Sequence, residues 1–287
     1  MNDQAAKLRK RIEQLKAYRQ AKTIAVISGK GGVGKSNFAL NFSLTLSKNQ
    51  HKVLLFDLDI GMGNVDILLG LTPKYSIVDM FDKQLSIDDV VEIAPNNLSY
   101  IAAGSGLNEI FSIDEAKFEY FLKQLNDLIH SYDYIVFDMG AGVTQQSIYF
   151  MLAADECIIV TTPEPTSLTD AYAMIKHVTH KNNQLPLFLL VNRAINQKNG
   201  QQTMQRLQQV VNKFLARDLA PLGILPDDHT VMKAVTSQTP FTLYDPHAHI
   251  TRAMNQIVDQ YITNTINVNK KVPFTFINKL KQFIKER

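Results

Sequence analysis

Residues 29–36 have the composition of a phosphate-binding loop. They match the pattern G-x-x-x-x-G-K-[ST] in full, with Gly29, Lys30, Gly31, Gly32, Val33, Gly34, Lys35 and Ser36. Glycines let the backbone wrap around a phosphate with its N–H groups pointing inward. We expect Lys35 to neutralise the β- and γ-phosphates of a nucleotide and Ser36 to ligate Mg²⁺. An apolar run precedes the loop and a helical pattern follows it, so a nucleotide site is favoured over an unrelated glycine-rich turn.

Acidic residues stand at the ends of two apolar runs. One run ends at Asp57, and Asp59 follows it, which places two carboxylates at i and i+2. The other run ends at Asp138, the position of a carboxylate that holds a Mg²⁺-bound water. Ligands of a parallel sheet bind at the carboxyl ends of its strands. One carboxylate of the Asp57–Asp59 pair could therefore face Mg²⁺ and the other an attacking water; the alternative is an acidic strand end that caps a helix.

The residues after a later apolar run indicate which base is bound. Proteins that select GTP carry N-K-x-D at this place. Here Asn192 and Arg193 follow the run Leu187–Val191, and Ile195 stands where the specificity aspartate would be. Asn192 can still form a hydrogen bond with an adenine edge, and Arg193 can stack on the ring. ATP is therefore favoured over GTP.

These residues need a scaffold that brings strand ends together, and the chain has the pattern of one. Short apolar runs predict buried strands at Thr23–Ser28, Val53–Asp57, Leu98–Ala102, Tyr134–Asp138, Glu156–Thr161, Leu187–Val191 and Ala220–Leu225. Helical spacing appears between them, at Ser36–Lys48, Asp114–Ser131, Pro165–His180 and Gln201–Phe214. Such alternation predicts an α/β fold, a mostly parallel central sheet flanked by helices on both faces.

Charge is distributed unevenly along the 287 residues, whose formal net charge is +3. Residues 1–22 and 270–287 each have a net charge of +5, which leaves about −7 for the middle of the chain. A protein that binds nucleic acid more often carries its basic charge on the folded body. Basic ends on an acidic body indicate an anionic partner or a lipid surface, and we expect no nucleic acid partner.

Other features of the sequence exclude further classes of protein. No apolar run, Leu187–Val191 included, approaches the roughly 20 residues of a membrane-spanning helix. The first residues have no apolar core or cleavage site of a signal peptide. Cys157 is the single cysteine, so a disulfide framework or a multi-cysteine metal site within one chain is excluded. A cytoplasmic location is expected.

The N-terminal segment, residues 1–22, has a narrow apolar stripe with helical spacing. The stripe is surrounded by basic side chains and consists of Ala5, Leu8, Ile12, Leu15 and Tyr18. It could fold back onto the body. Otherwise it suits a groove on a partner protein.

The C-terminal segment, residues 266–287, combines a polar hinge with a basic amphipathic helix, and residues 23–265 form the predicted ATPase domain. The apolar face of the helix consists of Phe274, Ile277, Leu280, Phe283 and Ile284. This pattern is typical of helices that lie in a membrane interface. The alternative is a helix packed on the sheet; the hinge and the charge favour the membrane. One such helix binds lipid weakly, whereas two in a dimer reinforce each other.

The loop with two lysines resembles the deviant Walker A motif of the MinD/ParA class of ATPases. This resemblance implies that Lys30 reaches the nucleotide of a second protomer, so that ATP holds a homodimer together. Residues 57–64 are similar to the D-x-D-x-G-x-x-N switch of the same class, in which the second aspartate positions the hydrolytic water. Asp59 is then the water-positioning residue, and Asp57 is left for Mg²⁺. Pro226 and Asp227 resemble the second adenine-contacting loop of the class.

A further motif separates groups within this class. The partner-binding residues Asp3, Gln4, Leu8 and Arg9 belong to a segment that resembles the D-Q-A-x-x-L-R motif of the FlhG family, also called YlxH or FleN. The resemblance implies a slow ATPase that moves between cytoplasm and inner membrane surface and stimulates the GTPase FlhF, with Gln4 near the FlhF active site. It also implies contact with the flagellar proteins FliM and FliN/FliY. A MinD-like regulator of cell division, without FlhF contact, is the alternative.

Overall fold

One eight-stranded sheet forms the centre of the protein. The computed structural model describes residues 20–59, 63–102, 115–140, 145–266 and 276–285. The strands are β1 (Lys22–Ile27), β2 (Val53–Leu58), β3 (Glu92–Ala94), β4 (Leu98–Ile101), β5 (Tyr134–Met139), β6 (Glu156–Thr161), β7 (Leu187–Ala194) and β8 (Ala220–Pro226). Their order across the sheet is β3-β4-β2-β5-β1-β6-β7-β8, and only the β3–β4 pair is antiparallel among them. The predicted mostly parallel sheet is confirmed.

Helices connect most of the strands. They are α2 (Lys35–Lys48), α3 (Val65–Leu69), α4 (Ile77–Asp82), α5 (Ile87–Val90), α7 (Glu115–Ile129), α8 (Gln145–Ala153), α9 (Pro165–Lys181), α10 (Gln197–Leu215), α11 (His229–Thr236), α12 (Phe241–Tyr244), α13 (His249–Ile266) and α14 (Phe276–Lys285). A short 3₁₀ turn, η1, spans Pro95–Asn97. The four predicted helices correspond to α2, α7, α9 and α10. The short helices α3, α4 and α5 had no recognised pattern, and α13 continues to Ile266, into the predicted polar hinge.

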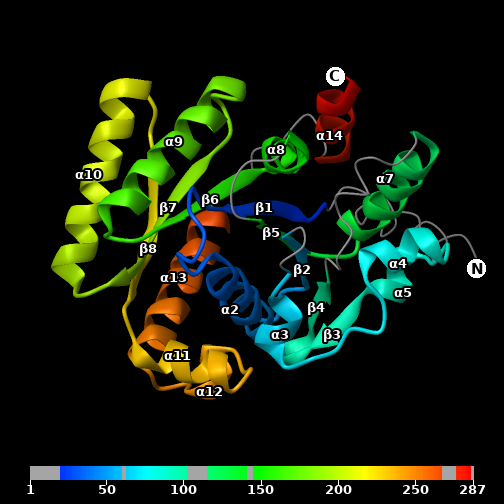
Figure 1. Cartoon of the computed structure of the whole chain (residues 1–287), viewed down its shortest axis with the longest axis horizontal. Coiled ribbons are helices and arrows are strands. Elements are labelled where there is room, and N and C mark those ends of the chain that lie inside the picture. Colours follow the sequence, from blue (N-terminus) through cyan, green and yellow to red (C-terminus); the bar gives the residue numbers. More distant parts are fainter. Residues whose placement is uncertain (1–19, 60–62, 103–114, 141–144, 267–275, 286–287) are drawn as a thin grey trace, which may run out of the picture.

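The helices form a layer on each face of the sheet (Figure 1). One apolar cluster joins α7, α8, α9, α10 and α14 to one face, and a second joins α2, α3, α11, α12 and α13 to the other. The central strands β1, β2, β5 and β6 are almost wholly buried, because both of their faces are covered. This explains why they read as continuous apolar runs rather than as alternating ones.

Strand register determines which residues meet at the carboxyl edge of the sheet. In the β2–β5 pair, Asp57 lies directly beside Asp138. In the β1–β5 pair, Val26 lies beside Asp138, so the loop that follows β1 begins next to the same carboxylate. Three strands that are distant in the sequence therefore bring the phosphate-binding loop and two aspartates to one place.

The C-terminal helix α14 packs on the body, which is the arrangement that the sequence analysis had disfavoured. Its residues Phe276, Ile277 and Leu280 are 3%, 5% and 0% exposed. Phe276 stacks on Phe137 of β5, with ring centroids 5.0 Å apart. The helix is amphipathic, as predicted, but its apolar face completes the core. Among the described residues, no helix is long and apolar enough to cross a membrane.

A buried polar cluster joins α13 to the amino-terminal edge of the sheet. Glu156, at the start of β6, accepts a hydrogen bond from the Tyr261 hydroxyl. It also forms an ion pair with Lys22, whose Nζ is 2.6 Å from Glu156 Oε2. The Lys22 ammonium also lies over the Tyr261 ring, 4.9 Å from its centroid. Because a buried carboxylate requires partners, this cluster fixes the position of α13.

Replacing Tyr261 by Phe removes one of the two partners of Glu156 and leaves the carboxylate buried. We expect the free energy of unfolding to fall by about 1–3 kcal/mol, the usual effect of an unsatisfied buried polar group. Urea denaturation measures it. Tyr244→Phe is the matched control, since this tyrosine is exposed on α12, and equal losses in both variants would contradict the role of the cluster.

Candidate nucleotide site

The phosphate-binding loop lies between the end of β1 and the start of α2, as predicted. Gly32 and Gly34 have positive φ, 78° and 87°, which non-glycine residues rarely adopt. A Cβ added to Gly29 would lie 2.1 Å from the backbone oxygen of Asp170 in α9. Glycine is therefore required at these positions by backbone conformation and by a close approach. These constraints hold the loop in a wrapped form against α9.

Lys35 and Asp138 form an ion pair within this site. Both side chains are almost fully buried, and the Lys35 ammonium donates to Asp138 Oδ1. Lys35 Nζ also lies 3.4 Å from the Ser36 hydroxyl. The pair joins the loop to the end of β5, so the structure brings together three residues that the sequence assigned to phosphate and Mg²⁺.

Asp57 lies beside this pair but turns towards its own loop. Its Oδ1 accepts from the backbone N–H of Asp59 at 2.9 Å, and its Oδ2 from those of Asn64 and Val65 at 3.1 and 3.3 Å. Asp57 thus caps the start of α3, the alternative that the sequence had left open. Burial, together with the nearby Asp138 charge, raises the pKa of Asp57 to about 7.

Asp59 is half-buried at the last described position before residue 63. A Cβ added to Gly140, just after β5, would be 2.9 Å from Asp59 Oδ1, so the segments after β2 and β5 approach closely here. Burial raises the pKa of Asp59, and the nearby Lys35 charge opposes that rise. The carboxylate is therefore placed at the rim of the site, between the two glycine-containing segments.

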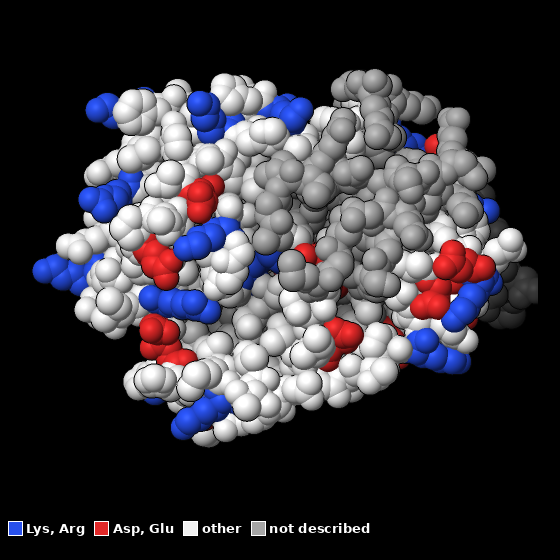
Figure 2. Space-filling view, in the orientation of Figure 1, with Lys and Arg blue, Asp and Glu red and all other residues white. Residues whose placement is uncertain are grey.

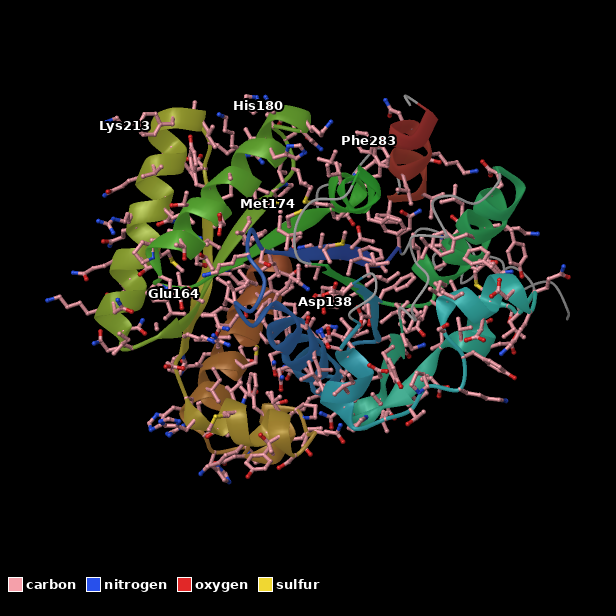
Figure 3. The ribbon with its side chains drawn as sticks, in the orientation of Figure 1. Asp138, Glu164, Met174, His180, Lys213 and Phe283 are labelled. Atoms are coloured by element: carbon pink, nitrogen blue, oxygen red, sulfur yellow. The ribbon has the colours of Figure 1, made fainter. Side chains whose placement is uncertain are left out.

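Lys30 is held by two residues that the sequence analysis missed. Its Nζ is 3.2 Å from Glu164 Oε2 and 3.1 Å from the Thr166 hydroxyl. Both residues stand at the start of α9, the end of the helix at which Figure 3 labels Glu164. The sequence shows a polar strand end at Thr161–Thr166, but only the pairing of β6 with β1 places it beside the phosphate loop.

Two loops on the β7–β8 side hold the residues predicted to contact the base. The amide nitrogen of Asn192 donates to the backbone oxygen of Val33 at 2.8 Å, so this side chain supports the phosphate loop. Arg193 is exposed and has a positive φ of 54°. Asp227, next to Pro226, donates its N–H to the backbone oxygen of Ala194 at 2.9 Å. The two predicted base loops are therefore joined.

Several predicted site residues lie outside the described part of the chain. The partner-binding residues Asp3, Gln4, Leu8 and Arg9 and the membrane residue Phe274 are among them, as is the side chain of Ile284. Of the predicted membrane face, Ile277 and Leu280 are buried in the core and Phe283 is partly buried against it.

The residues present fit a nucleotide with Mg²⁺. Asp138 Oδ2 is buried and has no hydrogen-bond partner among the described residues. This oxygen, the Ser36 hydroxyl and the Asp57 carboxylate are the ligand type that Mg²⁺ prefers. The buried ammonium of Lys35 and the wrapped loop suit phosphate.

Basic and acidic side chains lie side by side on the same face of the molecule, over α9 and α10 at the left of Figure 2.

Comparison with known proteins agrees with this geometry. The sequence matches the family described as ParA, NUBPL iron-transfer P-loop NTPase, over residues 19–262. It is 34% identical to the antiactivator FleN of Pseudomonas aeruginosa over 227 residues, 79% of this chain and 81% of that protein. It is 31% identical to the flagellum site-determining protein YlxH of Helicobacter pylori over 297 aligned residues, 99% of this chain and 100% of that protein.

A solved structure has the same fold. The septum site-determining protein MinD of Pyrococcus horikoshii, solved in complex with Mg-ADP, superposes with a TM-score of 0.71 and 23% sequence identity. The match covers 87% of this chain and 100% of the MinD chain.

The raised pKa of Asp57 predicts a dependence of stability on pH in the nucleotide-free protein. The folded pKa of about 7 exceeds the unfolded value of 3.8, so the unfolded state binds fewer protons between these values. The free energy of unfolding should therefore fall as pH rises from 4 to 7, by at most about 1.4 kcal/mol per pH unit from this group. We expect Asp57→Asn to make the slope less negative in urea denaturation series; parallel slopes for the two proteins would contradict the shift.

Proposed function

The chain belongs to the MinD/ParA family of P-loop ATPases, and we propose that it is an ATP-hydrolysing switch of the FleN/YlxH (FlhG) group that regulates the number and placement of flagella. The observation that carries this proposal is the similarity to YlxH, which extends over 99% of this chain and so includes both basic ends. A MinD-like regulator of cell division is the second candidate, supported by the fold of the MinD structure.

Nucleotide binding would exchange one ion pair for another. Lys35 is paired with Asp138. Phosphate groups in the loop would attract the Lys35 ammonium, and Asp138 would become available with Ser36 and Asp57 for Mg²⁺. The metal, when bound, supplies positive charge against the phosphates. Asp59 orients the attacking water, and slow turnover suits a protein whose purpose is to change state.

ATP-dependent dimerisation would require Lys30 to leave Glu164 and Thr166. Lys30 Nζ has both contacts within its own chain. Its side chain is 40% exposed and that of Glu164 61%, so the ion pair is weak. The γ-phosphate of a second protomer offers more negative charge than one carboxylate. Lys30 would therefore move to the partner's nucleotide, while ADP leaves it at Glu164.

Membrane association would follow from release of α14. Its buried residues Ile277 and Leu280 and its lysines form the pattern of an interfacial helix. A lipid surface can replace the apolar groove and adds attraction between the lysines and anionic headgroups. The protein would be cytoplasmic as a monomer and peripheral on the membrane as an ATP-bound dimer, with a domain division at residues 22/23 and 265/266.

The N-terminal segment would stimulate the GTPase FlhF, and the body would contact the flagellar proteins FliM or FliN/FliY. The motif Asp3–Arg9 supports the first of these contacts. A glutamine beside the γ-phosphate can orient an attacking water, a role that glutamine has in some GTPases. Gln4 is suited to this role, whereas Leu8 would fill a pocket. Nucleic acid is not proposed as a partner, because the body is acidic.

Lys30→Ala should bind ADP normally and fail to form the ATP-dependent dimer. A symmetric dimer loses two charge-assisted contacts, each about 1.5–3 kcal/mol, which weakens dimerisation by roughly a hundredfold or more. Size-exclusion chromatography with light scattering, in ADP and in a non-hydrolysable ATP analogue, measures this. Lys176→Ala, an exposed lysine of α9, is the matched control. Dimerisation of the Lys30 variant at wild-type affinity would show that Lys30 does not act across the interface.

Asp59→Ala should bind ATP and lose hydrolysis, because the carboxylate that orients the water is absent. The expected loss is on the order of 10² to 10⁴ in rate, measured as phosphate release. The variant should remain a dimer in ATP and sediment with anionic vesicles more completely than the wild type. Turnover at the wild-type rate would remove Asp59 from the hydrolytic residues.

A peptide of residues 1–23 should stimulate the GTPase FlhF without the ATPase domain. Phosphate release from FlhF at saturating GTP, with peptide titrated in, measures the stimulation. Gln4→Ala should reduce the maximal rate more than the binding, and Leu8→Glu should reduce the binding. Absence of stimulation by the unmodified peptide would favour the MinD-like alternative.

A further inference from the structure

Helix α14 packs against α7 and α8 (Figure 1), and we name the surface that it covers the C-terminal groove. Its floor is aromatic, because Phe276 contacts both Phe137 and Phe150, with ring centroids 5.0 and 6.0 Å apart. Leu280, one turn further along, is 0% exposed, and Phe283 is partly buried on the same face. The groove therefore receives apolar side chains from successive turns of one helix.

Acidic side chains border the C-terminal groove on both sides. Lys279 Nζ is 3.4 Å from Asp155 Oδ1, and Lys281 Nζ is 2.7 Å from Glu119 Oε2 of α7. The two lysines flank the buried Leu280. The groove thus accepts a helix in which a buried leucine is accompanied by basic residues.

Release of α14 to a membrane would uncover the floor of this groove. Phe137 belongs to the central strand β5, and Phe150 is 1% exposed while α14 is docked. Exposed aromatic surface is unfavourable in water, and a contiguous apolar surface bordered by charges is typical of an interaction site. A state with α14 on the membrane is therefore more favourable if another segment covers the groove.

The N-terminal segment contains a partial copy of the docked helix, in which three of seven residues are identical and Arg11 stands at the position of Phe276. Residues 12–18 read Ile-Glu-Gln-Leu-Lys-Ala-Tyr, and residues 277–283 read Ile-Asn-Lys-Leu-Lys-Gln-Phe. Three residues, Ile12, Leu15 and Lys16, are identical to their counterparts in α14, and Tyr18 stands at the position of Phe283. Leu15 corresponds to the buried Leu280, and Lys16 to Lys281, the partner of Glu119. Gln14 replaces Lys279 and retains a donor for Asp155.

Ala21, which follows this copy in the chain, is anchored to α7. Ala21, the residue before β1, donates its N–H to the backbone oxygen of Ile129 at 2.7 Å. Ile129 is the last residue of α7, the helix that forms one side of the groove. The copy ends at Tyr18, three residues before this bond, so its local concentration near the groove is high. Lys16 is a basic residue that suits the acidic border at Glu119.

We propose that residues 12–18 of the same chain replace α14 in the C-terminal groove when α14 binds a membrane. The inference rests on the proposed release of α14. The exchange would draw the preceding motif, Asp3–Arg9, against the body, so membrane attachment and presentation of the N-terminal motif would exclude each other. One groove would thus couple the two ends of the chain.

Two cysteine pairs in the full chain report the two occupants. Lys281→Cys with Glu119→Cys reports α14, and Lys16→Cys with Glu119→Cys reports the N-terminal copy; the native Cys157 is fully buried. A short bis-maleimide is added in ADP alone, and in a non-hydrolysable ATP analogue with phosphatidylglycerol–phosphatidylethanolamine vesicles. Mass spectrometry of the digested monomer band measures each intrachain cross-link. We expect the first cross-link to fall several-fold with ATP analogue and vesicles, and the second to rise several-fold.

Controls separate docking from random encounter. Leu15→Glu in the Lys16→Cys/Glu119→Cys background should abolish the rise, because it places a charge at the apolar position. Gln20→Cys with Glu119→Cys, which lacks the helical register, should be unaffected by vesicles. Vesicle sedimentation of each variant confirms that the membrane was bound.

The outcomes distinguish this inference from the proposed function. Persistence of the Lys281→Cys cross-link on vesicles means that α14 does not leave the groove. This result overturns both the proposed release of α14 and the exchange that rests on it. Loss of that cross-link without a gain at Lys16→Cys overturns the exchange alone. A gain that appears only in cross-linked dimers places the segment of a second copy in the groove and overturns the same-chain assignment.

Discussion

A buried lysine and a buried aspartate face each other at the carboxyl edge of the sheet, and neither charge could remain there alone. Lys35 comes from the start of α2 and Asp138 from the end of β5. An uncompensated charge in the interior is strongly destabilising, whereas the pair is tolerated. The loop must therefore lie against β5 in the absence of nucleotide. The same requirement means that a ligand can displace Lys35 only by bringing negative charge, which selects for phosphate and against neutral molecules.

Asp57 adds a second consequence of burial. Burial first, and the neighbouring Asp138 carboxylate second, raise the pKa of Asp57, because two carboxylates beside one ammonium leave an excess of negative charge. A divalent cation would relieve it. The backbone N–H groups of Asn64 and Val65 meanwhile hold Asp57 to the segment after β2. Any change in the charge of the site therefore alters the forces on this segment, which is a physical basis for a switch.

The sequence predicted the parts of this structure that depend on local patterns. Buried parallel strands are continuous apolar runs, and the loop at Gly29–Ser36 has a spacing that few other structures need. The contacts of Lys30 with Glu164 and Thr166 could not be predicted in this way, because they depend on β6 lying beside β1. The docking of α14 was also missed. An amphipathic helix has the same pattern whether it faces lipid or a groove, and only the aromatic floor formed by distant residues decides.

Asp155 connects the first strand to the last helix. Its Oδ2 accepts from the backbone N–H and the hydroxyl of Thr23, at 2.9 and 2.8 Å, while its Oδ1 faces Lys279. One carboxylate thus contacts both β1 and α14. Thermodynamic coupling is reciprocal. If departure of α14 weakens the anchoring of β1 by some factor, then displacement of the residues before β1 weakens the binding of α14 to the body by the same factor. Each terminus is in this sense an effector of the other.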